Sequence, residues 1–410
     1  MQLELLAPAG GLNQLKAAIS HGANAVYFGT NTLNMRAAAD GFTLENLADT
    51  VELAHENGVK TYLTLNATPH NEDLDGLETT IKTAVNAKID AFIAADLGVI
   101  QAIKTHAPTA TIHASVQMGV TNYMTANFLH DLGVKRIIVS RELTLEEIAE
   151  IRAKTPTSLE IEAFTHGAMC VSRSGRCLLS NYMTNRDANR GSCAQSCRWE
   201  YNLTEKTRPN APLTIGEDEK GAYILNANDM CMINHLDKMH AAGITSFKLE
   251  GRTKSEYYVA IVTNAYRAAL NILENSFEKF ELPSWILNEL EAISHRPYST
   301  GFYLNKNHAI QNHESAGYIR KHQVVGQVLG FKNDLLHIIQ RNRFFKGDEL
   351  EVLQPGAGVK PLSLAVKTIF NKKMEEIPAA NQSDTEIFLK TSPNALNIKT
   401  GAFLRGKLEK

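Results

Sequence analysis

The chain has 410 residues, of which 44% are hydrophobic and 21% charged, and its formal net charge is −2 at pH 7. This composition is sufficient for one large folded domain and a second, smaller one. No apolar run approaches the roughly 18 residues of a membrane-spanning helix, and the first residues lack the basic and apolar regions of a signal peptide. We therefore expect a cytoplasmic protein without membrane association.

Short apolar or β-branched runs alternate with segments of helical periodicity over residues 1–250. These runs lie at residues 3–7, 24–29, 60–65, 90–95, 111–116, 135–140, 159–165 and 246–251. Eight strands, each followed by a helix, predict an α/β fold with a parallel sheet, and eight is the number of units in a closed (β/α)8 TIM-like barrel. An open doubly wound sheet is the alternative, because spacing alone does not distinguish the two. No Gly-x-Gly-x-x-Gly follows the first run, which argues against dinucleotide binding.

A long insertion follows the seventh predicted strand, before a helix expected around residues 230–242. All five cysteines of the chain lie in it or at its end: Cys170, Cys177, Cys193, Cys197 and Cys231. In a barrel, the loops that follow the strands lie at the face where active sites are built. The insertion is therefore expected on the catalytic side.

The pattern changes near the end of the chain. A transition marked by prolines around residues 282–303 is followed by short alternating strands from about residue 322, separated by Gly, Asn and Pro. Such a pattern predicts a small all-β barrel or sandwich. We therefore divide the chain into a barrel (1–295), a connecting segment (296–321) and a β-domain (322–410).

The clustered cysteines predict a metal site. Four thiolates hold iron–sulfur clusters, and structural zinc also accepts four, usually in closely spaced pairs. Only Cys193 and Cys197 are as closely spaced as a zinc-binding pair, which favours an iron–sulfur cluster over zinc. The remaining alternative is that the cysteines are buried and act as small hydrophobic side chains. An odd number of cysteines argues against a disulfide framework. One thiol is surplus, either Cys197 or Cys231, which lies at the start of an expected helix where backbone N–H groups favour a thiolate.

Polar residues follow the predicted strands and would surround the barrel mouth. His166 and Glu250 are the candidates for proton transfer, and the candidates for substrate binding at strand ends are Asn34, Arg36, Asn66, Gln117 and Arg252. Alternation along a strand directs Lys248, Glu250 and Arg252 to one side. Arg36 and Arg252 could clamp a carboxylate or phosphate. Any single one of these residues could instead cap a helix or form a rim salt bridge.

The insertion is basic. Residues 172–208 contain seven Lys or Arg and three Asp or Glu, as an anionic partner would require. We expect phosphate or carboxylate groups to be held by Arg176, Arg186, Arg190 and Arg198. The pairs Asn181-Tyr182 and Arg198-Trp199 place aromatic rings among polar or basic residues, as binding of unstacked bases requires, although such a loop could also be merely solvated.

A nucleophilic peptidase is a weaker interpretation. His166 and Cys170 could form a Cys–His dyad. There is no G-x-S-x-G or H-E-x-x-H motif, and a nucleophilic Cys170 would leave the other four cysteines unexplained.

The run HGAMCVSRSGRCLLSNYMTNRDANRGSCAQSCRWEY (166–201) resembles the signature of peptidase family U32. Further blocks that resemble this family lie at residues 4–10, 25–36, 225–231, 247–260 and 295–302. The resemblance implies a [4Fe-4S] cluster and oxygen-independent hydroxylation of RNA bases or quinone precursors. Position by position, it places the cluster ligands on Cys170, Cys177, Cys193 and Cys231, and leaves Cys197 surplus.

The length of the chain narrows this resemblance. A barrel followed by one small β-domain is similar to the family members implicated in forming 5-hydroxyuridine at the tRNA wobble position. This resemblance implies that tRNA is a partner and that prephenate is a dicarboxylate co-substrate, bound by Arg36 and Arg252. An electron donor or iron–sulfur assembly proteins are implied as further partners. The alternatives are an iron–sulfur accessory protein that serves a separate hydroxylase, and a collagenase-like peptidase.

Overall fold

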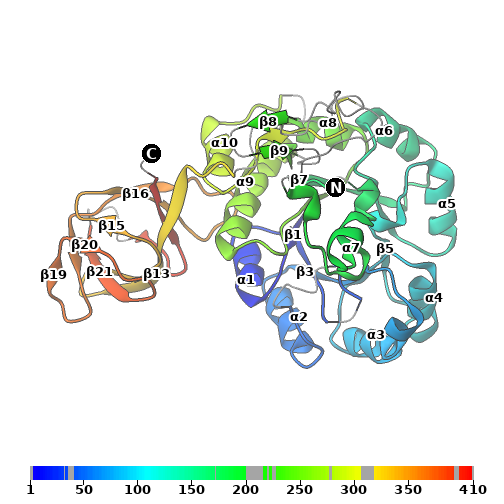
Figure 1. Ribbon diagram of the computed structural model, residues 1–410, viewed down its shortest axis with the longest axis horizontal. Helices are drawn as coiled ribbons and strands as arrows, with labels where there is room; N and C mark the ends of the chain where they lie inside the picture. Colours follow the sequence, from blue (N-terminus) through cyan, green and yellow to red (C-terminus); the bar gives the residue numbers. More distant parts are fainter. Residues whose placement is uncertain are drawn as a thin grey trace.

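Eight parallel strands form a closed barrel in the N-terminal part of this computed structural model (Figure 1). The structure describes residues 3–31, 33–35, 41–170, 172–199, 216–218, 221–223, 228–276, 279–305, 318–391 and 397–408. The barrel strands are β1 (Glu4–Pro8), β2 (Ala25–Phe28), β3 (Lys60–Leu65), β4 (Ala91–Ala94), β5 (Ile112–Ala114), β6 (Arg136–Ile138), β7 (Glu160–Ala168) and β11 (Ser246–Leu249). Because β11 pairs in parallel with both β1 and β7, the sheet closes, which excludes the open alternative. The predicted TIM-like fold is confirmed.

Helices between the strands cover the outside of the barrel (Figure 1). They are α1 (Leu12–Ser20), α2 (Leu47–Glu56), α3 (Leu77–Asn86), α4 (Leu97–His106), α5 (Tyr123–Asp131), α6 (Leu145–Ala153), α8 (Leu236–Ala241) and α9 (Glu256–Asn275). Side chains fix several helix starts: Asp96 accepts hydrogen bonds from the first turn of α4, and Thr144 forms a capping box with Glu147 at α6. No helix in the described part of the chain is long and apolar enough to cross a membrane.

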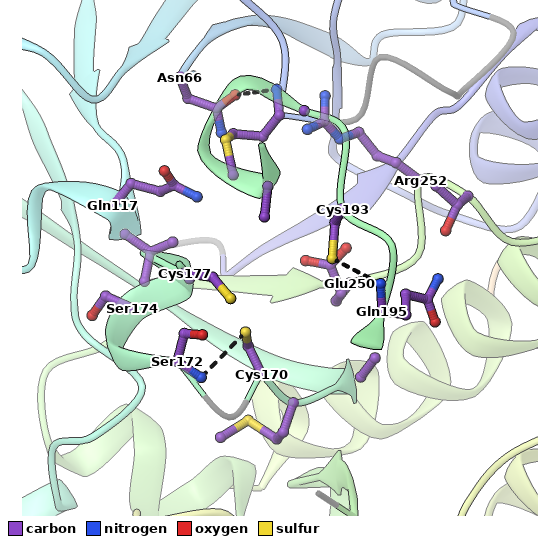
Figure 2. A pocket seen from close by; sticks show the side chains of 18 of the residues that line it. Asn66, Gln117, Cys170, Ser172, Ser174, Cys177, Cys193, Gln195, Glu250 and Arg252 are labelled. Atoms are coloured by element: carbon purple, nitrogen blue, oxygen red, sulfur yellow. Dashed lines mark hydrogen bonds between the residues drawn. The ribbon is translucent and has the colours of Figure 1, made fainter. Parts of the chain in front are cut away.

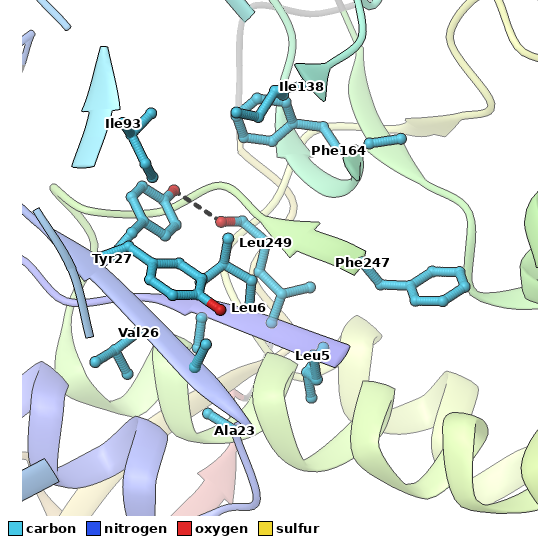
Figure 3. Packing of buried hydrophobic residues seen from close by; sticks show 14 of the residues in the cluster. Leu5, Leu6, Ala23, Val26, Tyr27, Ile93, Ile138, Phe164, Phe247 and Leu249 are labelled. Atoms are coloured by element: carbon cyan, nitrogen blue, oxygen red, sulfur yellow. Dashed lines mark hydrogen bonds between the residues drawn. The ribbon is translucent and has the colours of Figure 1, made fainter. Parts of the chain in front are cut away.

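The strands are mostly apolar because the helices cover one face of the sheet and the barrel interior lies on the other. Leu5, Val26 and Phe247 are fully buried in this core, and Figure 3 shows their packing around neighbouring strands. The Tyr27 hydroxyl donates a hydrogen bond to the carbonyl oxygen of Leu249 at 2.8 Å. This bond ties β2 to the end of β11, where the functional site begins.

The barrel interior also contains buried charges. Arg136 contacts Glu4 and Glu162 with N–O distances of 2.5 and 3.1 Å, and Nζ of Lys248 lies 2.7 Å from Glu162. Glu162 is fully buried, so its charge is tolerated only because both cations neutralise it. This chain of ion pairs ends at Lys248, a side chain of the functional site.

The insertion after β7 consists of short elements. These are η3 (Arg173–Gly175), α7 (Leu179–Thr184), η4 (Ala188–Arg190), η5 (Ser196–Arg198), β8 (Gly216–Asp218), β9 (Gly221–Tyr223) and β10 (Asp229–Cys231). β10 pairs antiparallel with the end of β7, with Cys231 opposite His166, and parallel with β12 (Tyr298–Ser299). The helix expected around 230–242 begins only at η6 (Ile233–His235) and continues as α8. The prediction that Cys231 starts a helix is therefore wrong, because pairing with β7 holds it in a strand.

The C-terminal part is an antiparallel β-structure that follows α10 (Ser284–Glu291), as predicted (Figure 1). Its strands are β13 (His322–Lys332), β14 (Leu335–Gln340), β15 (Phe344–Phe345), β16 (Glu349–Leu353), β17 (Leu362–Ala365), β18 (Thr368–Phe370), β19 (Glu376–Ile377), β20 (Ala379–Ala380), β21 (Glu386–Lys390) and β22 (Phe403–Lys407). It contacts the barrel at α1 and α9, where Gly356 N donates to Ser20 O and Asn264 exchanges two hydrogen bonds with Val359. The two parts are thus joined by specific polar contacts.

Candidate active site at the mouth of the barrel

The ends of the barrel strands and the cysteine-bearing insertion enclose a cavity of about 620 Å³. Strand ends contribute Tyr27, Thr64, Phe164 and Lys248, and the turns that follow them contribute Asn66, Gln117, Arg141, Glu250 and Arg252. The insertion contributes the remaining wall, including its cysteines (Figure 2). The expectation that the insertion lies at the C-terminal face of the barrel is confirmed.

Four cysteines line this cavity: Cys170, Cys177, Cys193 and Cys197. Figure 2 shows the sulfur atoms of Cys170, Cys177 and Cys193 directed into the same space. The Cys170 sulfur accepts a hydrogen bond from the Ser172 N–H, and the Cys193 sulfur accepts one from the Gln195 N–H, each at 3.4 Å. All five cysteines of the chain are free of disulfides.

Cys231 is separate from these four. It lies on β10, is half-buried, and is not among the residues that line the cavity. The Tyr266 hydroxyl donates to its sulfur at 3.9 Å, and burial raises the pKa of the thiol to about 11. Of the two candidates for the fourth ligand, it is Cys197 that lines the cavity.

Three charged side chains from the end of β11 line the cavity together, as strand alternation predicted: Lys248, Glu250 and Arg252. The Glu250 carboxylate accepts a hydrogen bond from Arg141 at 3.1 Å, and the Arg141 guanidinium lies 3.8 Å from the centre of the Phe164 ring. A side chain at Gly167, whose φ is +109°, would come within 2.6 Å of the Glu250 carbonyl oxygen. Only glycine therefore lets β7 approach the Glu250 backbone this closely.

Lys248 is buried at the inner end of the cavity. Its ammonium group bonds to Glu162 and lies 4.2 Å from the centre of the Tyr27 ring. Burial lowers the pKa of Lys248, although the Glu162 carboxylate opposes this shift. The position of the Lys248 ammonium group is thus set by Glu162 and Tyr27 inside the barrel.

Arg252 is held in place by the polar side chains of Asn34 and Thr64. Its guanidinium donates to Asn34 at 2.5 Å and to Thr64 at 3.0 Å. Asn34 is buried and does not line the cavity, so it positions Arg252 instead of facing a ligand. Arg36, the expected partner of Arg252 in a carboxylate clamp, lies outside the described residues. The other cations beside Arg252 in the cavity lining are Arg141, Arg186, Lys248 and Lys254.

His166, one of the two candidates for proton transfer, lies outside the lining. It is 2% exposed and is surrounded by the rings of Tyr258, Tyr266 and Tyr298. Burial lowers the pKa of His166 to about 3, so the imidazole is neutral. Of the two candidates, only Glu250 is at the cavity.

Two amides, Asn66 and Gln117, line the cavity as expected. Asn66 Oδ1 accepts a hydrogen bond from Met35 N at 3.4 Å. Gln117 is 6% exposed, and its Oε1 has no hydrogen-bond partner among the described residues. Figure 2 shows the Gln117 side chain extending toward the cavity. A buried carbonyl oxygen without a partner is costly, so this position is suited to a ligand that donates a hydrogen bond.

The four predicted arginines of the insertion have different environments. Arg186 lines the cavity, whereas Arg176 is exposed outside its lining. Arg190 pairs with Glu72 and Asp73 at 2.8 and 2.6 Å, which neutralise its charge. The side chain of Arg198 lies outside the described residues.

Sequence reasoning did not select Tyr27 or Phe164 as site residues. Tyr27 and Phe164 lie within apolar strands and resemble core residues in sequence. Lys248 carried a usable signal, because it alternates with Glu250 and Arg252 along one strand. Arg141 follows the sixth strand, and only the fold brings it to Glu250.

Comparison with known proteins agrees with the motifs. Residues 10–313 match the model of peptidase family U32, and residues 320–405 match that of the peptidase family U32 C-terminal domain. The chain is 37% identical over 381 residues to tRNA hydroxylation protein P1 of Bacillus subtilis (strain 168), covering 92% of this chain and 89% of that protein.

Two further relatives match most of the chain. It is 34% identical over 444 residues to tRNA hydroxylation protein P of Escherichia coli (strain K12), covering 98% of this chain and 96% of that protein. It is 31% identical over 371 residues to a protein named collagenase from Porphyromonas gingivalis (strain ATCC BAA-308 / W83), with 87% of each chain covered. Because the family models and these relatives extend over nearly its whole length, the chain belongs to peptidase family U32.

Proposed function

We propose that this protein hydroxylates C5 of the wobble uridine of tRNA, in a prephenate-dependent reaction that does not use oxygen. The observation that carries the proposal is the combination of cysteine thiols, a carboxylate and several cations around one cavity of about 620 Å³. A cavity of this size is sufficient for a base and a small co-substrate. The identity to two relatives named tRNA hydroxylation proteins supports tRNA as the substrate.

We propose that a [4Fe-4S] cluster is held by Cys170, Cys177, Cys193 and Cys231, with Cys197 as the alternative fourth ligand. Among the side chains that the structure describes, no three His, Cys, Asp or Glu groups converge on the position of one metal ion. A cluster binds each thiolate at a different iron atom, so it suits cysteines that surround a wider space. When bound, such a cluster supplies one-electron transfer at the cavity.

The cations of the cavity would bind the co-substrate. Prephenate has two carboxylates, which need at least two cationic partners, and Arg252 is the partner suggested by both sequence and position. Arg36 remains the proposed second partner of Arg252. Arg186 and Lys254 are further cationic side chains of the lining, and neither forms an ion pair with a described residue.

Replacing the C5 hydrogen with a hydroxyl group is a two-electron oxidation, so the co-substrate would supply the hydroxyl group and be reduced by two electrons. Glu250 would accept the proton that leaves C5. Its hydrogen bond with Arg141 orients the carboxylate. Gln117 and Asn66 would bind the edge of the base. Uracil presents an N3–H donor between two carbonyl acceptors, and an amide side chain complements this pattern with one acceptor and one donor.

A peptidase function is not favoured by this geometry, although one relative is named collagenase. A nucleophilic cysteine needs a basic partner within hydrogen-bond reach, and no histidine is among the residues that line the cavity in the described part of the chain. His166 is buried with a pKa of about 3 and packs against tyrosine rings.

The test is an assay with purified protein alone. Protein prepared without oxygen is incubated with unmodified tRNA, prephenate and a reductant, and the nucleosides are analysed by mass spectrometry. Formation of 5-hydroxyuridine supports the proposal, and its dependence on prephenate tests the co-substrate. If product forms only after a second protein is added, the chain is an accessory protein; release of peptides from gelatin by iron-free protein would instead indicate a peptidase.

A further inference from the structure

The most exposed large hydrophobic side chain of the described residues lies beside the cavity. Tyr182, on α7, is 82% exposed, and its neighbours Leu178 and Met183 are 63% and 45% exposed. Trp199, which follows η5, is 43% exposed. We call these four residues, together with Arg173, Arg176 and Arg186, the α7 surface. Exposed apolar groups gathered in one short segment are typical of an interaction site.

Among the described residues, none neutralises the positive charge of the α7 surface. Arg173, Arg176 and Arg186 are exposed, and no hydrogen bond or ion pair of their guanidinium groups occurs with any described residue. Asp187 is the single acidic residue of segment 172–199. Its carboxylate accepts a hydrogen bond from Asn189 N at 2.8 Å, so it caps η4. An anionic partner would therefore complement this surface.

The fold fixes α7 in place and leaves Tyr182 outward. Ser180, two residues earlier, is 1% exposed. Its hydroxyl donates to Arg186 O at 2.7 Å and accepts from Ala194 N at 3.0 Å. Residues two positions apart lie on nearly opposite sides of a helix, so the anchoring of Ser180 directs Tyr182 toward solvent. The exposed ring is thus presented on a supported element.

The α7 surface is continuous with the cavity. Cys177, Ser180 and Arg186 line the cavity, and they lie before, within and after the exposed segment. Figure 1 shows α7 in front of the barrel and inside its ring of helices. A polymer with one unit in the cavity would therefore extend over α7.

We propose that the α7 surface binds the unpaired nucleotides that flank the target base of an RNA, with Tyr182 stacked on one base and the three arginines on phosphates. The identity of the polymer rests on the proposed function. Bases outside a duplex offer a free face to an aromatic ring, and arginines beside that ring bind the adjacent backbone. An acidic protein would also be attracted to the arginines, but a nucleic acid explains both the charge and the exposed ring.

The test measures binding without the reaction. The probe is a fluorescent RNA hairpin with a uridine-containing unpaired loop, compared with a duplex of the same composition and titrated with the full-length protein in the absence of prephenate. We expect the hairpin to bind more tightly than the duplex. Tyr182→Ala should weaken hairpin binding by roughly 5- to 100-fold, as loss of one stacked base does, whereas Tyr182→Phe retains the ring and the affinity. The matched control is Phe128→Ala, because Phe128 is 56% exposed on α5.

The salt dependence of hairpin binding tests the arginines. Arg173→Gln should lower the slope of log affinity against log salt by about 0.7, as loss of one phosphate contact on a single strand does. Lys104→Gln on α4 is the charge control and should leave the slope unchanged.

Equal affinity of Tyr182→Ala and wild type for the hairpin would overturn the proposal. The proposal would also be overturned if Tyr182→Ala kept its RNA affinity but was reduced more slowly than wild type by an electron-donor protein. That result would identify the α7 surface as a protein-docking surface. If the hairpin binds through Tyr182 but no hydroxylation is detected, the proposed function is refuted and the proposal of RNA binding by the α7 surface still holds.

Discussion

The carboxylate of Glu250, at the end of β11, accepts a hydrogen bond from the guanidinium of Arg141, which follows β6, at 3.1 Å. The contact joins residues 109 positions apart in the sequence and places a charged acceptor in the cavity that contains four of the five cysteines. The guanidinium also donates to Ala168 O at 3.1 Å, so it ties the carboxylate to the end of β7.

Replacing Glu250 with Gln should remove proton transfer while it preserves the size of the side chain. We expect kcat for 5-hydroxyuridine formation to fall by roughly 10²- to 10⁴-fold, which is the usual contribution of a general base. Affinity for tRNA and iron content should stay at wild-type values. A fall in iron content equal to the fall in activity would show instead that Glu250 acts on the metal site.

Gln117 should contribute to recognition of the base. Gln117→Ala removes the complementary amide, so kcat/KM for the uridine substrate should fall about tenfold, as loss of one hydrogen bond predicts. Gln117→Glu replaces the amide donor with a second acceptor that repels a uracil carbonyl, and its loss should be larger. Gln101→Ala on α4 is the control. Unchanged kcat/KM in both Gln117 variants would exclude a role in base binding.

Cys231→Ala and Cys197→Ala form a matched pair that identifies the fourth ligand. Because the family's ligand positions fall on Cys170, Cys177, Cys193 and Cys231, we expect Cys231→Ala to lose the iron, acid-labile sulfide and visible absorbance and Cys197→Ala to retain them. The opposite result would mean that the cysteine lining the cavity, Cys197, is the ligand. Protein is purified without oxygen, and thermal unfolding of each variant distinguishes a missing ligand from a general loss of structure.

Glu4 should make the stability of the barrel depend on pH. Burial favours its neutral form, but Arg136 and hydrogen bonds more than offset this, so the pKa of Glu4 lies below its usual value of 4.5. A carboxyl whose pKa is lowered by folding stabilises the folded state above the unfolded pKa, and this contribution is lost as pH falls through the folded pKa. Glu4→Gln should lower the free energy of unfolding at neutral pH by about 3 kcal/mol.

The difference between Glu4→Gln and wild type should then shrink as the pH is lowered from 6 toward 3. Urea unfolding at several pH values measures this directly. Lys82→Gln is the control, because the salt bridge of Lys82 with Glu78 is exposed and should contribute little at any pH. A difference that does not change with pH would show that the charge of Glu4 is not the stabilising feature.

Much of the architecture followed from local patterns. The eight apolar runs became the eight barrel strands, because a parallel strand buried on both faces is mostly apolar. Cys231 was expected in a helix and lies in β10, because its pairing with β7 depends on a segment distant in sequence.

The candidate site was predictable in composition but not in arrangement. The sequence by itself determined three features of the site, because each is a property of neighbouring residues. They are the clustering of the cysteines, the basic residues of the insertion and the alternation at residues 248, 250 and 252. Only the closed barrel decided that Arg141 meets Glu250, that Asn34 holds Arg252 rather than a ligand, and that His166 is buried outside the cavity lining. These contacts join strands far apart in the chain, and their burial sets which groups carry charge, so they depend on tertiary structure.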